Sequence, residues 1–279
     1  MDEKKTDDNA FEASSIPTAP HGPNVHVSTH PVVAHKLSIL RSSATLPHAF
    51  RAALREITFH LAHEATSTLT TRDIPITVPY TSSSSALDAN GDDDVRPKGG
   101  PSTAGHVDAV GRKIRERVAI VPILRSGLGM VEPMLELVNN ATVHHIGMYK
   151  IRSSQMPVQY YNRLPRVCNV DVAYVLDPLI ATSNTITSVV GILEKWGVRE
   201  IHVISVIASK TGLSELVKKH PTVHVTLGHI DDALSESGDV LPGLGDAGDR
   251  LFGTAENPEL DDLVHVSKRK RTMSSDLGK

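Results

Sequence analysis

Apolar residues along the chain form short continuous runs and longer one-sided stripes. One continuous run, residues 118–124, is typical of a strand covered on both faces. Residues 172–176, 201–208 and 223–227 are mostly apolar and predict three further strands. The stripes are typical of helices and span residues 50–61, 134–138, 186–193 and 213–217. Because runs and stripes alternate from residue 118 onward, the sequence predicts an α/β fold with a parallel sheet and right-handed crossovers.

The sequence marks the ends of two of these helices, and the strands indicate where a ligand would bind. Thr45 and Pro47 indicate where the first helix starts, and Gly197 indicates where the helix at 186–193 ends. In parallel sheets, ligands bind beyond the carboxyl ends of the strands. We therefore expect the chemistry in the loops that begin at Arg125, Asp177 and Ala208.

Three segments are too poor in large apolar residues to offset the entropy of ordering. They are residues 1–24, residues 81–106 and residues 255–279. The first and last are expected to be a disordered N-terminal extension and a polar C-terminal tail. The middle segment lies inside the chain, so we interpret it as a low-complexity surface loop inserted into one domain of residues 25–254.

The composition excludes several classes of protein. Of the 279 residues, 39% are hydrophobic, which is enough for a domain with a real core. A net charge of −3 argues against binding to nucleic acid. Cys168 is a lone cysteine, so no internal disulfide is expected. We interpret it as a small buried hydrophobic residue, with a nucleophile as the alternative.

The sequence predicts a cytoplasmic protein. It contains no run of about 18 apolar residues, so we expect no membrane span. The polar N-terminus lacks the apolar stretch of a signal peptide. The run Lys268–Arg271 suggests nuclear entry as an alternative, although a solvated tail explains it more simply.

The segment Asp177–Thr185 lies between a buried strand and an amphipathic helix. Thr182, Ser183 and Asn184 gather where the helix starts, and free backbone N–H groups there can bind a phosphate. Asp177 follows the strand directly, where its carboxylate suits ribose hydroxyls or a metal-bound water. An ordinary helix cap after a loop aspartate is the alternative interpretation.

Arg125 directly follows the strand at 118–124 and is a candidate clamp for a pyrophosphate, which a guanidinium can hold through two hydrogen bonds. Gly127 and Gly129 then allow a close approach of the backbone. The segment is not a dinucleotide fingerprint, because Glu132 stands where the third glycine would be.

Gly243, Gly245 and Gly248 match the spacing G-x-G-x-x-G. That motif binds dinucleotides only between the strand and the helix of a βαβ unit, and the ordered chain is expected to end soon after this segment. We therefore interpret Val240–Arg250 as a glycine-rich loop whose main chain contacts a small flat ligand.

His60, His63 and Glu64 resemble a zinc-protease motif, but their order is H-x-x-H-E rather than H-E-x-x-H. We interpret them as an ordinary helix surface.

Several of these segments resemble one enzyme family. Residues 121–130 are similar to V-P-I-L-R-A-G-L-G-M, residues 177–185 to D-P-M-L-A-T-G-G-S, and residues 242–254 to P-G-L-G-D-A-G-D-R-x-F-G-T. Residues 35–41, 50–51, 64–66 and 147–149 add weaker matches. From about His30 to Thr254, the chain therefore resembles uracil phosphoribosyltransferases, which are type I phosphoribosyltransferases. The resemblance implies a parallel-sheet phosphoribosyltransferase fold with an N-terminal helical region and a β-arm insertion.

The same resemblance implies a role for each candidate residue. The substrate 5-phosphoribosyl 1-pyrophosphate (PRPP) would contact Arg125, Lys150, Asp177, Pro178, Leu179, Ile180, Ala181, Thr182, Ser183, Asn184, Thr185 and Asp246. Uracil would contact Val240, Gly245, Asp246 and Ala247, largely through main-chain groups. The catalytic residues would be Arg125, Asp177 and Asp246. Mg²⁺ would be bound mainly through the substrate, and the chain would form a homodimer or a larger homo-oligomer.

This sequence departs from the family pattern at three places. Ser183 and Asn184 replace paired glycines, His63 replaces a tyrosine, and Lys150 replaces an arginine. A phosphate-binding loop often needs one residue with a positive φ, which asparagine tolerates better than serine. We therefore expect Asn184 to be tolerated at such a position, and Ser183 to be tolerated only if it keeps a negative φ.

The implied reaction joins N1 of uracil to C1′ of the ribose and releases pyrophosphate, which makes UMP for pyrimidine salvage. Arg125, Lys150 and Mg²⁺ would stabilise the charge on the leaving pyrophosphate. A catalytically weak or inactive homologue, which binds a nucleobase or phosphoribosyl ligand in a regulatory role, is one alternative. A phosphoribosyltransferase for another base is a second, and the specific match at residues 242–254 argues against it.

Overall fold

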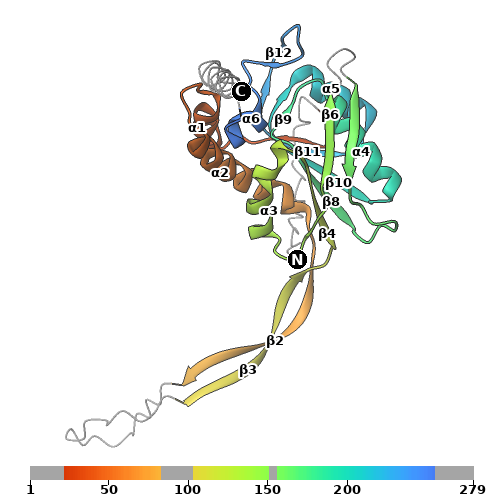
Figure 1. Ribbon diagram of the computed structural model, residues 1–279. Coiled ribbons are helices and arrows are strands. Elements are labelled where there is room, and N and C mark those ends of the chain that lie inside the picture. Colours follow the sequence, from red (N-terminus) through yellow and green to blue (C-terminus); the bar gives the residue numbers. More distant parts are fainter. Residues whose placement is uncertain (1–21, 83–102, 151–155, 255–279) are drawn as a thin grey trace, which may run out of the picture. The chain divides into compact units, whose positions relative to one another are not determined.

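The computed structural model describes residues 22–82, 103–150 and 156–254 (Figure 1). Its helices are α1 (Pro31–Arg41), α2 (Pro47–Ala65), α3 (Val131–Leu137), α4 (Asn184–Trp196), α5 (Lys210–Lys219) and α6 (Ala247–Phe252), with short 3₁₀ helices η1 (Thr66–Thr68) and η2 (Ser126–Met130). Its strands are β1 (Val25–Val27), β2 (Thr71–Ser82), β3 (Thr103–Ile114), β4 (Val118–Leu124), β5 (Thr142–Val143), β6 (Ile146–Lys150), β7 (Pro157–Asn162), β8 (Val172–Leu176), β9 (Leu179–Ile180), β10 (Glu200–Ser209), β11 (His224–Asp231), β12 (Ala233–Leu234) and β13 (Val240–Leu241). The chain divides into two units, residues 67–116 and the remainder.

The larger unit is built on one sheet with the strand order β1-β11-β10-β8-β4-β6-β7. Neighbouring strands in this order are parallel, apart from the antiparallel pair β6 and β7. Strands β4 and β8 begin and end at the residues that the apolar runs predict. The predicted α/β class with a parallel sheet is therefore confirmed.

Helices cover both faces of this sheet, which explains the continuous apolar runs. On one face, Val189 and Leu193 of α4 pack into a core with Val175 and Val203 of the strands. Because successive strand residues point to opposite faces, Tyr174 and its neighbours at alternate positions face the other side, where α2 lies.

Helix α2 begins at Pro47, as the sequence predicts, because proline suits the first turn of a helix. Its apolar stripe, Phe50, Leu54, Ile57 and Leu61, is fully buried. Each such side chain contributes about 1.5–3 kcal/mol by leaving water. His63 is exposed and His60 half-buried, so both lie on the helix surface as predicted. None of the described helices is both long and apolar enough to cross a membrane.

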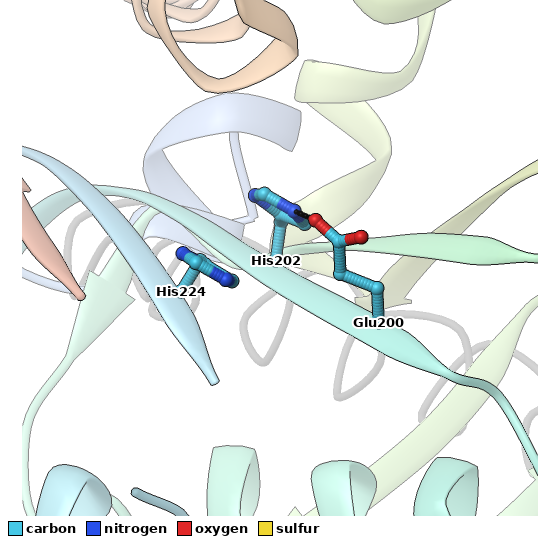
Figure 2. A group of neighbouring side chains, drawn as sticks. All are labelled: Glu200, His202 and His224. Carbon is cyan, nitrogen blue, oxygen red and sulfur yellow. Dashed lines mark hydrogen bonds and ion pairs between the residues drawn. The ribbon is translucent and has the colours of Figure 1, made fainter. Parts of the chain in front are cut away.

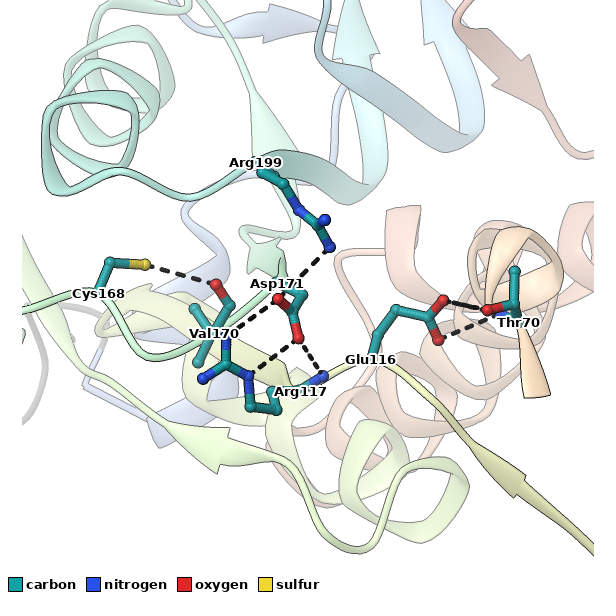
Figure 3. Close-up of polar contacts among 7 residues, drawn as sticks. All are labelled: Thr70, Glu116, Arg117, Cys168, Val170, Asp171 and Arg199. Carbon is teal, nitrogen blue, oxygen red and sulfur yellow. Dashed lines mark hydrogen bonds and ion pairs between the residues drawn. The ribbon is translucent and has the colours of Figure 1, made fainter. Parts of the chain in front are cut away.

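The smaller unit is a two-stranded hairpin. Strands β2 and β3 pair without interruption from Thr71 opposite Ile114 to Ser82 opposite Thr103. At the base, the amide and hydroxyl of Thr70 donate to the carboxylate of Glu116 (Figure 3). The predicted loop at 81–106 thus overlaps the ends of both strands, while residues 83–102, 1–21 and 255–279 lie outside the described residues.

At the amino-terminal edge of the large sheet, Arg117 and Asp171 form a fork-shaped ion pair (Figure 3). The Arg117 amide donates to the same carboxylate at 2.9 Å. The guanidinium of Arg199 lies 3.4 Å from the other carboxylate oxygen of Asp171. The hydrogen bonds from Arg117 lower the pKa of Asp171 from 3.8 to about 2. The pair therefore stabilises the folded state above pH 3.8, and this contribution is lost as the pH falls toward 2.

We expect Asp171→Asn to weaken the pH dependence of stability in that acidic range. Both side chains of the pair are partly exposed, so solvent screening should keep the difference below about 1 kcal/mol. Urea unfolding at a series of pH values measures it. If the variant loses stability with the same slope as the native protein, Asp171 does not titrate as the geometry implies.

Candidate functional site

The segments that follow three strands meet at the carboxyl-terminal edge of the sheet, where the sequence predicts the chemistry. The hydroxyl of Ser126, after β4, donates to the carboxylate of Asp177, after β8, at 3.1 Å. The hydroxyl of Ser209, at the end of β10, donates to the carbonyl of Ala181 at 2.6 Å. The loop predicted to begin at Ala208 is absent, because β10 continues to Ser209 and α5 starts at Lys210. This direct junction of strand and helix holds the second loop in place.

A pocket opens at the loop between β8 and α4. Its volume is about 330 Å³, including the space open to solvent. It is lined by Asp177, Leu179, Ile180, Ala181, Thr182, Ser183, Asn184, Thr185 and Ile186. The predicted residues of the 177–185 segment, apart from Pro178, thus line one cavity, whereas Arg125, Lys150 and Asp246 are not among its lining residues.

Ser183 takes a left-handed conformation directly before helix α4, with φ 61° and ψ −6°. The condition under which Ser183 was expected to be tolerated, a negative φ, is therefore not met. Asn184 is the first residue of α4, so the sharp turn from the loop into the helix is made one residue earlier, at the cap position. The Ser183 side chain makes no capping hydrogen bond, so the first N–H groups of α4 remain available to an anion.

Buried hydroxyl groups surround this helix start. The hydroxyl oxygens of Thr182, Ser183 and Thr187 have no hydrogen-bond partner among the described residues. A buried hydroxyl without a partner costs about 1–3 kcal/mol, so such groups mark a place where a polar ligand would be stabilising. Sequence reasoning missed Thr187, although it lies one helical turn after Ser183.

The left-handed Ser183 leads to a stability prediction. Ser183→Gly should raise the free energy of unfolding by about 1 kcal/mol, because glycine adopts positive φ without the steric cost of a β-carbon. Thermal unfolding of the native protein and the variant measures the change. Asn184→Gly is the matched control and should be destabilising, because Asn184 is helical. A lower midpoint for Ser183→Gly would contradict the argument.

Two glycines make close backbone contacts that hold these loops together. A β-carbon on Gly127 would lie 2.3 Å from the carbonyl oxygen of Leu176, so the predicted close approach at Gly127 is confirmed. A β-carbon on Gly212 would lie 2.0 Å from the carbonyl oxygen of Ala181. Gly212 also donates its amide to Ser209 at 2.8 Å, and sequence reasoning missed both residues.

Arg125, directly after β4, contacts the last described residues of the domain. Its guanidinium donates to the carboxylate of Asp249 at 2.7 Å and to the hydroxyl of Thr254 at 3.2 Å. Hydrogen bonds from Thr254 and Arg125 lower the pKa of Asp249. The Arg125 side chain is 52% exposed, so it can turn from Asp249 toward a bound anion.

The glycine-rich segment contains a short helix that the sequence analysis did not predict. Asp246 caps α6 by accepting a hydrogen bond from the Asp249 amide at 2.8 Å. Gly243 and Gly245 have positive φ values of 59° and 73°. Strand β13 pairs with β12 in an antiparallel hairpin, so no βαβ unit surrounds the glycines and they are not a dinucleotide motif.

A buried ion pair fixes the conformation of Gly243. Arg41 of α1 donates to both carboxylate oxygens of Asp231 at 2.8 and 2.6 Å, and to the Gly243 carbonyl at 2.7 Å. The Gly243 amide donates to the same carboxylate at 3.0 Å. Burial alone would raise the pKa of Asp231, but these hydrogen bonds lower it overall. Both polar groups of the Gly243 backbone are therefore held by this pair.

Arg250 ties the same segment to the N-terminal helices. Its guanidinium donates to the carbonyls of Leu244 at 2.7 Å and Ser42 at 2.5 Å, and also to that of Leu40. It lies 4.6 Å from the centre of the Phe50 ring, in a cation–π contact. The glycine-rich segment is therefore fixed on two sides before any ligand binds.

The turn that precedes the glycine-rich segment lies beside the phosphate loop. A β-carbon on Gly238, in the β12–β13 turn, would lie 3.3 Å from the Thr182 side chain. One on Gly248 would lie 3.2 Å from the Asp246 carboxylate and 3.6 Å from the Arg125 guanidinium. The side chains of Arg125 and Asp246 therefore both lie close to Gly248.

The remaining predicted residues are placed as follows. Val240 and Ala247 are buried in the glycine-rich segment, and Gly245 is exposed. Lys150 ends strand β6, but its side chain lies outside the described residues.

Comparison with known proteins shows which family this chain is similar to. The family profile described as uracil phosphoribosyltransferase matches residues 27–95 and 94–254. A uracil phosphoribosyltransferase from Roseiflexus sp. is 40% identical over 230 residues, which cover 82% of this chain and 98% of that protein. One from Agathobacter rectalis is 38% identical with the same coverage. The solved structure of the AQ2163 protein from Aquifex aeolicus superposes with a TM-score of 0.68 at 26% identity, covering 82% of this chain and 97% of that one.

Proposed function

This chain belongs to the uracil phosphoribosyltransferase family, and we propose that the site at the carboxyl edge of its sheet makes UMP and pyrophosphate from uracil and PRPP. The chain is a pentosyltransferase that acts in pyrimidine salvage. The observation that carries the site assignment is the start of helix α4, where free N–H groups and unpartnered hydroxyls surround one pocket. That arrangement supports binding of a phosphorylated sugar.

We assign PRPP to the pocket at residues 177–185. The 5′-phosphate would accept hydrogen bonds from the first N–H groups of α4 and from the hydroxyls of Thr182 and Ser183. The Asp177 carboxylate, already oriented by Ser126, would face the ribose hydroxyls. Arg125 would leave Asp249 to bind the pyrophosphate, with Lys150 and Asp246 on the same substrate.

We assign uracil to the glycine-rich segment, where Val240, Gly245, Asp246 and Ala247 would contact it. Gly245 has a positive φ of 73°, a left-handed conformation that other residues rarely adopt. Arg41 and Asp231 act as positioning residues, because they hold Gly243 without facing the ligand themselves. A preformed loop avoids the entropic cost of ordering its main chain on binding.

The residues of the pocket fit Mg²⁺ bound through PRPP. Mg²⁺ prefers oxygen ligands and usually keeps several waters, and this pocket offers the Asp177 carboxylate with the Thr182 and Ser183 hydroxyls. When bound, the ion neutralises negative charge on the pyrophosphate. Asp177 would hold the ion through its waters and the ribose.

The chemical step needs alignment and charge stabilisation rather than a covalent nucleophile. The bond from C1′ to the pyrophosphate oxygen breaks as the bond from C1′ to N1 of uracil forms, and uracil loses its N1 proton. The rigid glycine-rich segment would direct N1 toward C1′, and Arg125 would stabilise the charge that moves onto pyrophosphate. The close approach of Gly238 to Thr182 supports two neighbouring subsites, which this reaction requires.

Arg125→Ala should lower kcat/KM for UMP formation about 10- to 150-fold. A charge-assisted hydrogen bond of this kind contributes about 1.5–3 kcal/mol. The thermal midpoint should change little, because the side chain is half-exposed. Arg199→Ala is the matched control at the opposite edge of the sheet and should leave turnover unchanged. Unchanged turnover in Arg125→Ala, or a loss explained by unfolding, would contradict the assignment.

We further propose that the chain acts in the cytoplasm as a homo-oligomer and that the β2–β3 hairpin contributes to the contact between copies. The large hydrophobic side chains of Tyr80, Val107 and Val110 are exposed on this hairpin. Exposed hydrophobic surface of this kind is typical of a contact with another protein chain. Residues 268–271, the alternative nuclear signal, lie outside the described residues.

A further inference from the structure

Two histidines and one glutamate meet at the amino-terminal edge of the sheet, away from the proposed active site (Figure 2). Glu200 and His202 are two residues apart on β10, so both side chains lie on the same face of the strand. His224, on the neighbouring strand β11, pairs with His202 in the sheet register. Three potential ligands thus come from two rigid strands.

We propose that Glu200, His202 and His224 bind one Zn²⁺ ion. One potential ligand atom of each residue lies within 4.8 Å of those of the other two. Two ligand atoms of a tetrahedral zinc ion, each about 2.0–2.2 Å from the metal, lie about 3.3–3.6 Å apart, so the side chains must approach one another by at most about 1.5 Å. In the part of the chain that the structure describes, no other three His, Cys, Asp or Glu side chains meet this condition.

The donor set suits zinc rather than magnesium. Two imidazole nitrogens and one carboxylate are typical of zinc and similar transition metals, whereas Mg²⁺ prefers oxygen ligands throughout. With neutral histidines the cluster carries one negative charge, from Glu200.

The site is partly open to solvent, and two of its side chains must adjust to bind an ion. The Glu200 side chain is 41% exposed and His224 is half-buried, while His202 is 3% exposed beside the Tyr174 ring. The His202 and His224 rings stack at 4.6 Å with an interplanar angle of 13°. The partly exposed His224 ring must therefore turn to share the ion. His202 Nε2, which lies 2.6 Å from the Glu200 carboxylate, can bind the ion in the tautomer that carries its proton on Nδ1.

The zinc would be structural and separate from the substrate Mg²⁺. Strand β10 runs from Glu200 to Ser209, whose hydroxyl holds the phosphate loop. At about 3.3 Å per residue, this places the zinc roughly 23–30 Å from that loop. Bound zinc would link β10 to β11, two central strands of the sheet.

Titration of the metal-free full-length chain with Co²⁺, a visible probe for zinc sites, tests the proposal. We expect one Co²⁺ per chain with the intense absorption of a four-coordinate ion, displaced by one equivalent of Zn²⁺ and not by Mg²⁺. His224→Ala and Glu200→Gln should each weaken binding at least about 100-fold, because even the loss of an outer-shell partner costs 10–100-fold.

His220→Ala is the control. His220 contacts Glu194 at 2.9 Å in a histidine–carboxylate pair that has no third ligand, so this variant should bind Co²⁺ like the native chain. Glu200→Gln keeps the size of the side chain and can keep its hydrogen bond to His202, so it remains informative if His224→Ala fails to fold. Absence of the absorption band, or native affinity in Glu200→Gln, would overturn the proposal.

Discussion

Asp231→Ala should destabilise the protein by about 3–5 kcal/mol and weaken its use of uracil. Breaking a buried ion pair by removing one partner leaves the other charge uncompensated, which accounts for the size of the effect. The side chains of Asp231 and Arg41 are 2% and 22% exposed. The variant also leaves the Gly243 amide without its acceptor. The loop assigned to uracil therefore loses the contacts that fix its shape.

Asp171→Ala is a matched control for this prediction. Asp171 also accepts a forked arginine and a backbone amide, but its side chain and that of Arg117 are 22% and 64% exposed at the opposite edge of the sheet. Its loss should cost less than about 1 kcal/mol and leave the KM for uracil unchanged.

Asp231→Asn separates a positioning role from general stability. The asparagine can still accept from the Gly243 amide but cannot neutralise Arg41. We expect the KM for uracil to rise more than the KM for PRPP in this variant. Equal changes in both constants, or an Asp231→Ala variant as stable as Asp171→Ala, would contradict the positioning role.

Uracil should be preferred over cytosine by about 10⁴-fold in kcat/KM. Uracil offers an acceptor at position 4 and a donor at N3, and cytosine reverses both. A main-chain amide cannot reverse its polarity, and the segment that contains Gly245 is fixed by Arg41 and Arg250 before the base binds. Cytosine would therefore leave buried polar groups unpaired.

Initial rates with each base at saturating PRPP measure this preference. A preference below about 10-fold would mean that the glycine-rich segment adapts to the base, or that side chains select it. Thymine keeps the polarity of uracil, so it separates the effect of hydrogen bonding from the effect of size.

Much of the fold could be predicted because the central strands are buried on both faces. The runs at 118–124 and 172–176 contain no charged or amide side chain that could hide their bounds, and β4 and β8 match them. Strands of two or three residues, such as β1 and β12, are too short for a pattern to appear. The hairpin β2–β3 was interpreted partly as a loop, because its apolar residues are mixed with proline and charge.

The candidate site was predicted where a strand leads directly into a loop, as at Arg125 and Asp177. The residues that hold the site in place were missed for a physical reason. Arg41 and Asp231 are 190 residues apart in the sequence, and only the packing of α1 against β11 brings them together. The positive φ of Ser183 was also missed, because propensity favours asparagine there and the tertiary fold decides otherwise.

The central claim is that this chain catalyses phosphoribosyl transfer to uracil at the site between the 177–185 loop and the glycine-rich segment. The initial rate of UMP formation by the full-length chain, from uracil and PRPP with Mg²⁺, tests it most directly. The account predicts UMP and pyrophosphate in equal amounts, at a rate that requires Mg²⁺ and falls at least about 10-fold in Arg125→Ala. No UMP from the folded native chain, or UMP formed equally fast by Arg125→Ala, would contradict the claim.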